Sequence, residues 1–249
     1  MEGPTYVTLS AQIALQKELD VVANNVANAS TTGFKADRQL FQSYVDRLNV
    51  PGGSIDFVQD RATYIDRSAG PIQATDNALD IAVQGDGYLS VGGPQGTSYT
   101  RNGHLQVGQD GTLEDSSGRP VLSPDGTPVQ LPQQYTDLQI QADGTVNVRV
   151  RGVWQNVGQI GTFRPTDPLA LRKTGDGQLT DPSNAMQPIG AGDPASHLVQ
   201  GALEGSTVQP VREIANMTEL GRAYEQLQTL LSDDNDRERK MIAALGQPA

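Results

Sequence analysis

The sequence contains no cysteine, so disulfide bonds and thiolate metal sites are excluded. Aromatic residues are scarce at 5% and apolar residues reach only 36%, whereas glycine (27) and proline (15) are plentiful. Such a composition favours many turns and short strands over one thick core. No apolar run approaches the roughly 20 residues of a membrane-spanning helix. We therefore expect no membrane insertion of this chain.

Residues 1–10 contain no lysine or arginine, and no apolar block typical of a secretory signal follows them. Any export is therefore expected to occur without a cleaved signal peptide. Positive charge is limited along the whole chain, because 18 Lys and Arg face 29 Asp and Glu, for a net charge of −11. Binding to phosphate groups needs clustered Lys and Arg, so neither nucleic acid nor an anionic membrane surface is an expected partner.

No sequence pattern indicates catalysis. The nucleophile motif Gly-x-Ser-x-Gly is absent. His104 and His197 are far apart in the sequence and have no cysteine nearby, so they do not suggest a metal site. The five Asp-Gly pairs are spaced too irregularly for a calcium-binding repeat or an EF-hand, and we interpret them as turns. The expected protein is not an enzyme and uses no cofactor or metal.

An amphipathic helix is expected near the N-terminus. Pro4 suits the first turn of a helix, and apolar residues then recur every three or four positions on one face. The apolar positions of this face are Val7, Ala11, Leu15, Leu19, Val22 and Val26. Such spacing is typical of a helix that packs against a partner.

The end of this helix is rich in asparagine, with Asn24, Asn25 and Asn28. Asparagine is a poor helix former, so these residues either fray the helix end or use their amides to bind other helices in a tight bundle. Gly33 is suited to a left-handed stop, and Phe34 is the expected anchor of the segment that follows.

A second amphipathic helix is expected at the other end of the chain, beginning at Pro210 in the first turn. Its apolar face consists of Val211, Ile214, Met217, Leu220, Tyr224, Leu227 and Leu231. A continuous helix of about 36 residues would extend roughly 54 Å, which is longer than one small β-domain needs. The length indicates packing beyond the subunit.

Between the two helical segments the apolar pattern changes to a period of two, which predicts an antiparallel β-domain over residues 70–200. Residues 138–150 form the clearest hairpin, with its turn at Asp143-Gly144. Residues 98–107 are expected to form another hairpin, because Asn102-Gly103 tolerates the φ angles of a two-residue turn. Residues 36–69 are expected to be a connecting arm with little core.

The predicted fold class is α+β. The amphipathic helices of residues 1–35 and 201–249 are expected to pack as an α-helical inner domain, with a central antiparallel all-β domain between them in sequence. Neither apolar face has a local core beside it, so each must pack on the other or on a neighbouring molecule. Ordering about 25 residues costs about 1–2 kcal/mol each, so the first helix is expected to be largely disordered in the free monomer.

Several segments resemble sequence blocks of the bacterial flagellar rod and hook axial proteins, and they occur in the same order. They are residues 23–35, 78–88, 99–103, 201–206 and 222–225. Residues 57–63 and the overall length are most similar to proximal-rod members of this family. Asp76 and Ala78 stand where the family usually has Gly and Pro, and Thr207 and Gln209 stand where it usually has Asn. The first pair affects one turn and the second weakens the expected cap of the last helix.

The resemblance implies a structural subunit of the proximal rod of the flagellar basal body, a helical tube that crosses the periplasm, transmits torque and surrounds the export channel. The implied partners are copies of the chain, adjacent proximal-rod and distal-rod proteins, and the flagellar type III export apparatus during secretion. The expected subunit interface comprises the apolar positions of both helices together with Asn24, Asn25, Asn28, Gly33 and Phe34.

Two other classes remain open on the sequence. A secreted adhesin or phage-tail fibre would use its helices in a closed trimeric stalk, but it would need sustained heptads in one continuous helix. An enzyme that cleaves glycans with its β-domain would need an acid–base pair, and no two of the 29 acidic residues stand out for that role.

Overall fold

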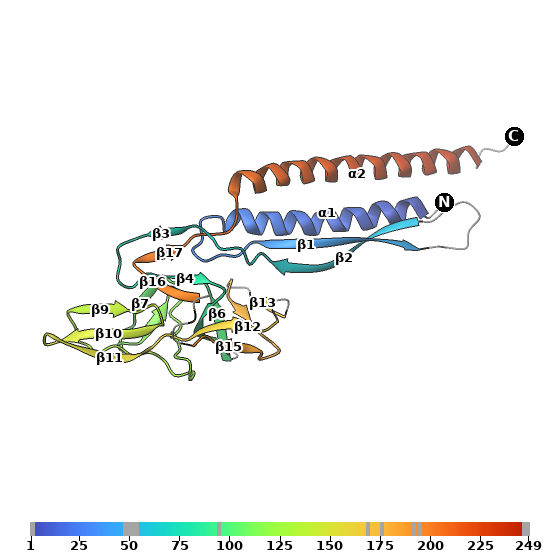
Figure 1. Cartoon of the computed structure of the whole chain (residues 1–249). Coiled ribbons are helices and arrows are strands. Elements are labelled where there is room, and N and C mark those ends of the chain that lie inside the picture. Colours follow the sequence, from blue (N-terminus) through green and yellow to red (C-terminus); the bar gives the residue numbers. More distant parts are fainter. Residues whose placement is uncertain are drawn as a thin grey trace. The chain divides into compact units, whose positions relative to one another are not determined.

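The computed structural model describes residues 3–46, 55–93, 96–167, 170–174, 177–190, 193 and 196–245. The chain forms two compact units (Figure 1), which we call the helical unit and the β unit. The helical unit comprises Met1–Ala27, Asp37–Tyr64 and Val208–Ala249, and the β unit comprises Asn28–Ala36 and Ile65–Thr207.

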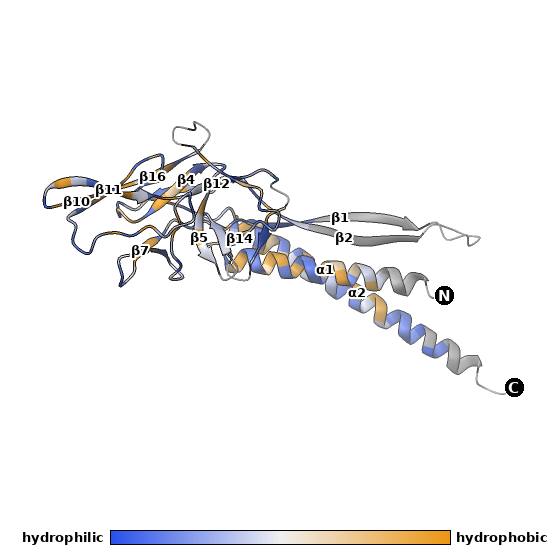
Figure 2. Ribbon diagram, turned by 90° about the horizontal axis from the view of Figure 1, so that it is seen from below, coloured by the Kyte–Doolittle hydropathy of each residue, from blue (hydrophilic) through white to orange (hydrophobic). Residues whose placement is uncertain are grey.

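The helical unit contains α1 (Gly3–Ala27) and α2 (Pro210–Leu245), which pack side by side (Figures 1 and 2). It also contains β1 (Asp37–Asp46) and β2 (Ile55–Ile65), which pair as a two-stranded ribbon. Both helices begin within one residue of the prolines that predicted them, because proline is tolerated in the first turn. Hydrophobic and hydrophilic residues alternate along both helices (Figure 2), as expected for amphipathic helices.

The segment predicted as a connecting arm contributes β1 and β2. Within it, residues 47–54 lie outside the described residues.

The β unit consists of short strands. They are β3 (Ile72–Ala74), β4 (Ile81–Gly85), β5 (Tyr88–Gly93), β6 (Gly96–Thr100), β7 (Leu105–Val107), β8 (Leu113–Asp115), β9 (Asp137–Ile140), β10 (Thr145–Val150), β11 (Val153–Gln159), β12 (Thr162–Pro165), β13 (Arg172–Lys173), β14 (Leu179–Thr180), β15 (Met186–Pro188), β16 (Ser196–Gln200) and β17 (Ala202–Glu204).

The largest sheet of the β unit has six strands in the order β13-β14-β6-β5-β12-β15. A second sheet has the order β11-β10-β9, and β16-β4, β17-β3 and β7-β8 form two-stranded sheets. The pairings of the β unit are antiparallel. The predicted α+β class with an antiparallel β body is thus confirmed in outline.

The core of the β unit is built from aliphatic side chains that belong to different sheets. Its fully buried members include Ile81, Leu89, Val91, Leu113, Val121, Val146, Val148 and Ile160. Tyr88, Leu171 and Leu179 form a smaller buried cluster. The largest fully buried side chains of this core are aliphatic, in agreement with the low aromatic content of the chain.

Two hairpin predictions have different outcomes. The hairpin of residues 138–150 is confirmed, with Val146 opposite Ile140 and Val148 opposite Leu138. The hairpin around Asn102-Gly103 is wrong, because β6 pairs with β5 and β14 while β7 pairs with β8. Gly103 instead passes against β4, where its carbonyl oxygen accepts from Ile81 N at 3.0 Å. The glycine is required there by a close backbone approach rather than by a turn.

Segments on either side of the predicted domain limits belong to the β unit. Phe34, Lys35 and Ala36 are buried in it, and Ala202–Glu204 forms β17 beside β3. The chain therefore passes from one compact unit to the other after Ala27, Ala36, Tyr64 and Thr207. The limits predicted at residues 35, 69 and 200 remain a proposal about domains in the assembled protein.

Candidate assembly site

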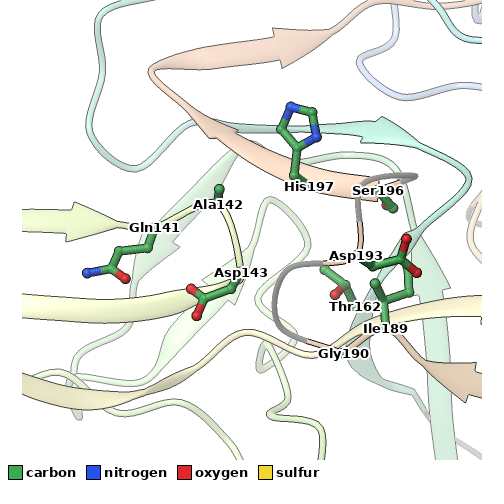
Figure 3. A pocket seen from close by; sticks show the side chains of 9 residues that line it. All are labelled: Gln141, Ala142, Asp143, Thr162, Ile189, Gly190, Asp193, Ser196 and His197. Atoms are coloured by element: carbon green, nitrogen blue, oxygen red, sulfur yellow. The ribbon is translucent and has the colours of Figure 1, made fainter.

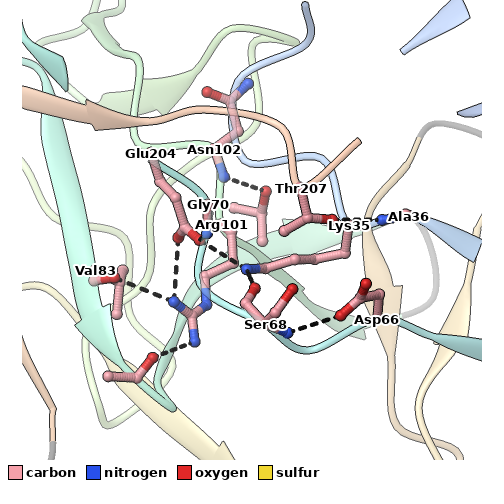
Figure 4. Close-up of polar contacts among 12 residues, drawn as sticks. Lys35, Ala36, Asp66, Ser68, Gly70, Val83, Arg101, Asn102, Glu204 and Thr207 are labelled. Carbon is pink, nitrogen blue, oxygen red and sulfur yellow. Dashed lines mark hydrogen bonds and ion pairs between the residues drawn. The ribbon is translucent and has the colours of Figure 1, made fainter. Parts of the chain in front are cut away.

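Three charged side chains meet inside the β unit (Figure 4), and we call them the buried charge cluster. Lys35 Nζ lies 2.7 Å from Glu204 Oε1, and Arg101 Nη1 lies 3.1 Å from Glu204 Oε2. The three side chains are at most 3% exposed. They come from three of the sequence blocks described above, so the fold brings these blocks together at one point.

Backbone groups complete the coordination of the buried charge cluster. Lys35 Nζ donates to Ser68 O at 2.6 Å, and Gly70 N donates to Glu204 Oε1 at 2.8 Å. Arg101 donates to Val83 O at 3.1 Å and to Gly85 O at 2.6 Å. Burial lowers the pKa of Lys35, although its hydrogen bond and ion pair with Glu204 act in the opposite direction. One carboxylate thus serves two buried cations.

The sequence did not predict the buried charge cluster. Lys35 and Glu204 are 169 positions apart, so no local spacing could pair them. The sequence offers one weak indication that these charges are buried: each of the three charged residues stands among glycine or apolar residues.

Gly33 and Phe34, two predicted interface positions, have structural roles within the β unit. Gly33 adopts φ 67°, and a Cβ atom there would lie 2.3 Å from the carbonyl carbon of Arg101. The predicted left-handed conformation of Gly33 is therefore confirmed, but Gly33 is not the stop of the helix, because α1 already ends at Ala27. Phe34 is buried, and Lys173 Nζ lies 3.9 Å from the centre of its ring.

Asn25 is 1% exposed and fixes the start of β1 within the helical unit. Its Nδ2 donates to Asp37 O at 2.9 Å, and its Oδ1 accepts from Asp37 N at 2.9 Å. Asn28 accepts a hydrogen bond from Thr31 Oγ1 at 3.2 Å, and Asn24 is exposed. Asn25 thus uses its amide inside the chain, whereas contacts of Asn24 and Asn28 with other helices stay a prediction.

The apolar face predicted for α1 is largely turned inward. Val22 is buried, and Ala11, Leu15, Leu19 and Val26 are half-buried. Val7 lies in α1, but its side chain is outside the described residues. Leu9 and Ile13, which the sequence pattern did not single out, are 46% and 52% exposed. Together they leave apolar surface on α1 that its own chain does not cover.

The apolar face predicted for α2 divides into two parts. Leu220, Tyr224, Leu227 and Leu231 are half-buried. Val211, Ile214 and Met217 are 84%, 53% and 41% exposed. Between them Glu213 is buried and accepts from Arg38 Nη1 at 2.9 Å. The first two turns of α2 therefore combine an exposed apolar face with a fixed ion pair.

Ser196, His197, Asp143 and Asp193 line a pocket of about 230 Å³ (Figure 3). Ser196 and His197 are neighbours on β16 and point to opposite faces of the strand. Ser196 Oγ accepts from Gly87 N at 3.2 Å, and Asp193 pairs with Arg164 at 3.2 Å. This pocket therefore does not assemble a nucleophile with a base.

The two histidines lie far from each other in the sequence, and one of them has an acidic partner. His104 Nδ1 lies 2.8 Å from Asp80 Oδ1. Within the described part of the chain, no group of three or more His, Asp or Glu could hold a metal ion. None of the helices within the described ranges is long and apolar enough to cross a membrane.

Three family models match successive parts of this architecture. The flagella basal body rod protein model matches residues 6–35, the FlgE/F/G hook protein D1 domain model matches residues 82–148, and the FlgEFG basal body rod C-terminal model matches residues 199–244. The basal-body rod protein FlgF of Caulobacter vibrioides is 34% identical over 99% of this chain and 99% of its own length. The chain belongs to the FlgF-type flagellar basal-body rod proteins.

Further relatives support this membership. FlgF of Mesorhizobium japonicum is 32% identical over 99% of both chains. The rod protein FlgG of Bacillus subtilis is 29% identical over 95% of this chain and 97% of its own. The family consists of structural rod proteins, so the chain is a structural protein and not an enzyme, and the fibre and glycan-cleaving alternatives are set aside.

The departures from the family pattern are accommodated locally. Asp76 adopts φ 57°, a left-handed conformation that favours glycine but that Asp tolerates, and its N–H donates to Gly201 O at 3.2 Å. Thr207 Oγ1 accepts from Ala36 N at 2.9 Å. Its hydroxyl therefore binds the backbone of the segment that follows Phe34.

Proposed function

We propose that this chain is a structural subunit of the proximal part of the flagellar basal-body rod. It assembles with copies of itself and with adjacent proximal-rod and distal-rod proteins into a helical tube that transmits torque across the periplasm and surrounds the export channel. One observation carries the proposal: in a chain of the rod family, α1 and α2 pack together and both still expose apolar residues.

The exposed apolar residues of the helical unit are the proposed direct contacts with neighbouring subunits. Burying one such side chain contributes about 1.5–3 kcal/mol, so Val211, Ile214 and Met217 together favour association. The contact is heterologous, because a head-to-tail contact generates an open helical assembly. Buried members of the predicted interface, such as Asn25, Gly33 and Phe34, support the geometry of these surfaces from within the chain.

Inside the β unit, the segment that follows α1 and the segment that precedes α2 are joined by backbone hydrogen bonds. Gly33 N donates to Glu204 O at 2.7 Å, and Thr207 N donates to Phe34 O at 3.1 Å. The buried charge cluster lies on the same two segments. A load applied to α1 and α2 therefore reaches the β unit through two crosslinked segments rather than one, which suits a torque-bearing subunit.

We further propose that the chain leaves the cytosol through the flagellar type III export apparatus without a cleaved signal and resides in the periplasm-spanning rod. Membership of the rod family supports this proposal. The absence of cysteine makes folding independent of the redox state of either compartment.

The proposed interface is tested by placing a charge on the exposed apolar face of α2. Ile214→Asp should keep the circular dichroism spectrum of the purified chain, because Ile214 is 53% exposed, but should greatly lower the amount of chain in isolated basal bodies and reduce motility. Gln228→Asp, at an exposed polar position of the same helix, is the matched control. Wild-type amounts of Ile214→Asp in basal bodies would contradict the proposal.

A further inference from the structure

Asn102 and Gly103, which lie between β6 and β7, form the only Asn-Gly pair of the sequence. Asparagine is a chemically labile residue. It reacts most readily before glycine, because glycine has no side chain to hinder the attack of its backbone nitrogen on the asparagine side chain. In a flexible chain this pair is therefore a site of spontaneous deamidation.

The reaction at this pair needs water and no other reagent. The backbone nitrogen of Gly103 bonds to Cγ of Asn102, its proton passes to the side-chain nitrogen, and that nitrogen leaves as ammonia. The product is a five-membered succinimide, which then adds one water molecule. Opening at the original main-chain carbonyl leaves isoaspartate, in which the chain continues through the side-chain carbonyl; opening at the other carbonyl leaves aspartate.

The folded β unit holds the Asn102 side chain at both ends of its amide. Oδ1 accepts from His104 N at 3.1 Å, and Nδ2 donates to Ser116 Oγ at 3.1 Å. The backbone N of Asn102 donates to Thr100 Oγ1 at 3.0 Å. Closing the succinimide ring requires rotation of this amide and of the main chain that carries it. The rotation would break hydrogen bonds that each contribute about 0.5–1.5 kcal/mol.

The backbone of Gly103 is held as well. Gly103 is buried, and its carbonyl oxygen accepts from Ile81 N at 3.0 Å. It packs so closely that a Cβ atom there would lie 1.7 Å from Ile81 O. The attacking nitrogen must also give up its proton, and burial disfavours the negative charge that this creates. Folding thus removes the freedom of movement and the access to water that the reaction needs.

We infer that Asn102 is a modification site controlled by the fold: it converts to isoaspartate in the unfolded chain and is protected in the folded β unit. The hydrogen bonds and the close approach of Gly103 to Ile81 exist only after folding, so the unfolded chain has no such protection. The inference does not depend on the rod function, because it concerns the chain before any assembly.

Isoaspartate in place of Asn102 prevents the chain from folding again. It adds one atom to the main chain between two residues whose positions are both fixed. On one side, Arg101 donates to Val83 O at 3.1 Å and to Gly85 O at 2.6 Å within the buried charge cluster. On the other side, Gly103 has no space to move away from Ile81. A chain that stays unfolded is therefore gradually lost from the pool that can fold and assemble.

The first test compares the rate of conversion in the folded and unfolded full-length chain. The chain is incubated at physiological pH in buffer and in a series of urea concentrations. Mass spectrometry of the fragment that contains Asn102 then measures isoaspartate and aspartate at this position. The rate in buffer should be at least about tenfold lower than in high urea, because the reaction follows the unfolded fraction, which circular dichroism measures in the same samples. An equal or higher rate in buffer overturns the inference.

Asn102→Gln is the matched control for the first test. Its side chain is one methylene longer and would have to close a six-membered ring, which forms far more slowly. In high urea this variant should therefore show no conversion at position 102 over the same period. Conversion at the rate of the parent chain would assign the mass change to another position and overturn the inference.

The second test measures refolding of the converted chain. Chain aged in urea is diluted into buffer, and the folded fraction is isolated by size-exclusion chromatography. Isoaspartate at position 102 should be depleted from that fraction at least about tenfold, as expected for a backbone change at a close contact. An undepleted share of isoaspartate overturns the claim that conversion prevents folding. Asn102→Asp carries the same charge without the extra main-chain atom and should refold; its failure to refold would assign the defect to charge and contradict the role of the main chain.

Discussion

At the scale of single residues, the buried charge cluster holds two cations and one carboxylate, so its members are not equivalent. Glu204→Gln leaves Lys35 and Arg101 without a buried counter-charge and should lower the free energy of unfolding by about 3–5 kcal/mol. Lys35→Met removes one of the two cations and leaves Arg101 paired with Glu204, so it should lower the free energy of unfolding by clearly less than Glu204→Gln does. Urea unfolding of the two variants, followed by circular dichroism, measures the difference. Equal costs would show that charge balance does not govern this site.

Tyr88 gives a pH dependence with a defined sign. Burial raises the pKa of its phenol above the ordinary 10.0, and the charge of Arg101 only partly opposes this. The folded state therefore disfavours the phenolate, so the stability from this group is complete below pH 10 and is lost as the pH rises toward the folded pKa. Tyr88→Phe should lose less stability between pH 9 and pH 11 than the parent chain. Parallel stability curves in thermal unfolding would contradict this.

Single positions could be predicted from the sequence only where the constraint is local. The left-handed conformation of Gly33 followed from its place after a helix, and the structure confirms it. The partners of Lys35 and Asn25 did not follow, because each is fixed by backbone or side chains of another element. Leu9 and Ile13 were missed because they lie beside the main apolar face rather than on it.

At the scale of elements, both helices could be predicted because proline and a regular apolar repeat mark their starts and faces. The hairpin of β9 and β10 could be predicted because both strands and their turn are contiguous. The expected hairpin at Asn102-Gly103 does not form, because β6 pairs with β5 and β14. Which distant strands pair with each other cannot be inferred from a short stretch of sequence.

Gly103 provides a prediction for the contact that replaces that hairpin. A Cβ atom at this position would lie 1.7 Å from Ile81 O, so Gly103→Ala must displace backbone and should destabilise the chain by about 2 kcal/mol or more. Gly190→Ala is the matched control, because a Cβ there meets nothing within 4 Å and the backbone needs no left-handed conformation. Thermal unfolding of both variants measures this; a Gly103→Ala midpoint equal to that of the control would rule out the close approach.

At the scale of the whole molecule, the chain joins a β unit that has its own buried core to a helical unit whose described side chains include few buried apolar ones. In α1, the buried apolar side chains among the described positions are Ala14 and Val22. Their burial contributes a few kcal/mol at most, whereas ordering about 25 residues costs about 1–2 kcal/mol each. We therefore expect the helical unit to depend on neighbouring subunits for its stability.

Amide hydrogen exchange of the full-length chain, compared between the free monomer and isolated rods, tests this claim most directly. We expect the amides of α1 to exchange within seconds in the monomer and to become protected in the rod, while the strands of the β unit are protected in both states. Deletion is not needed, so the measurement does not depend on export of an altered chain. Slow exchange of α1 in the monomer, or equally fast exchange in the rod, would contradict this dependence on neighbouring subunits.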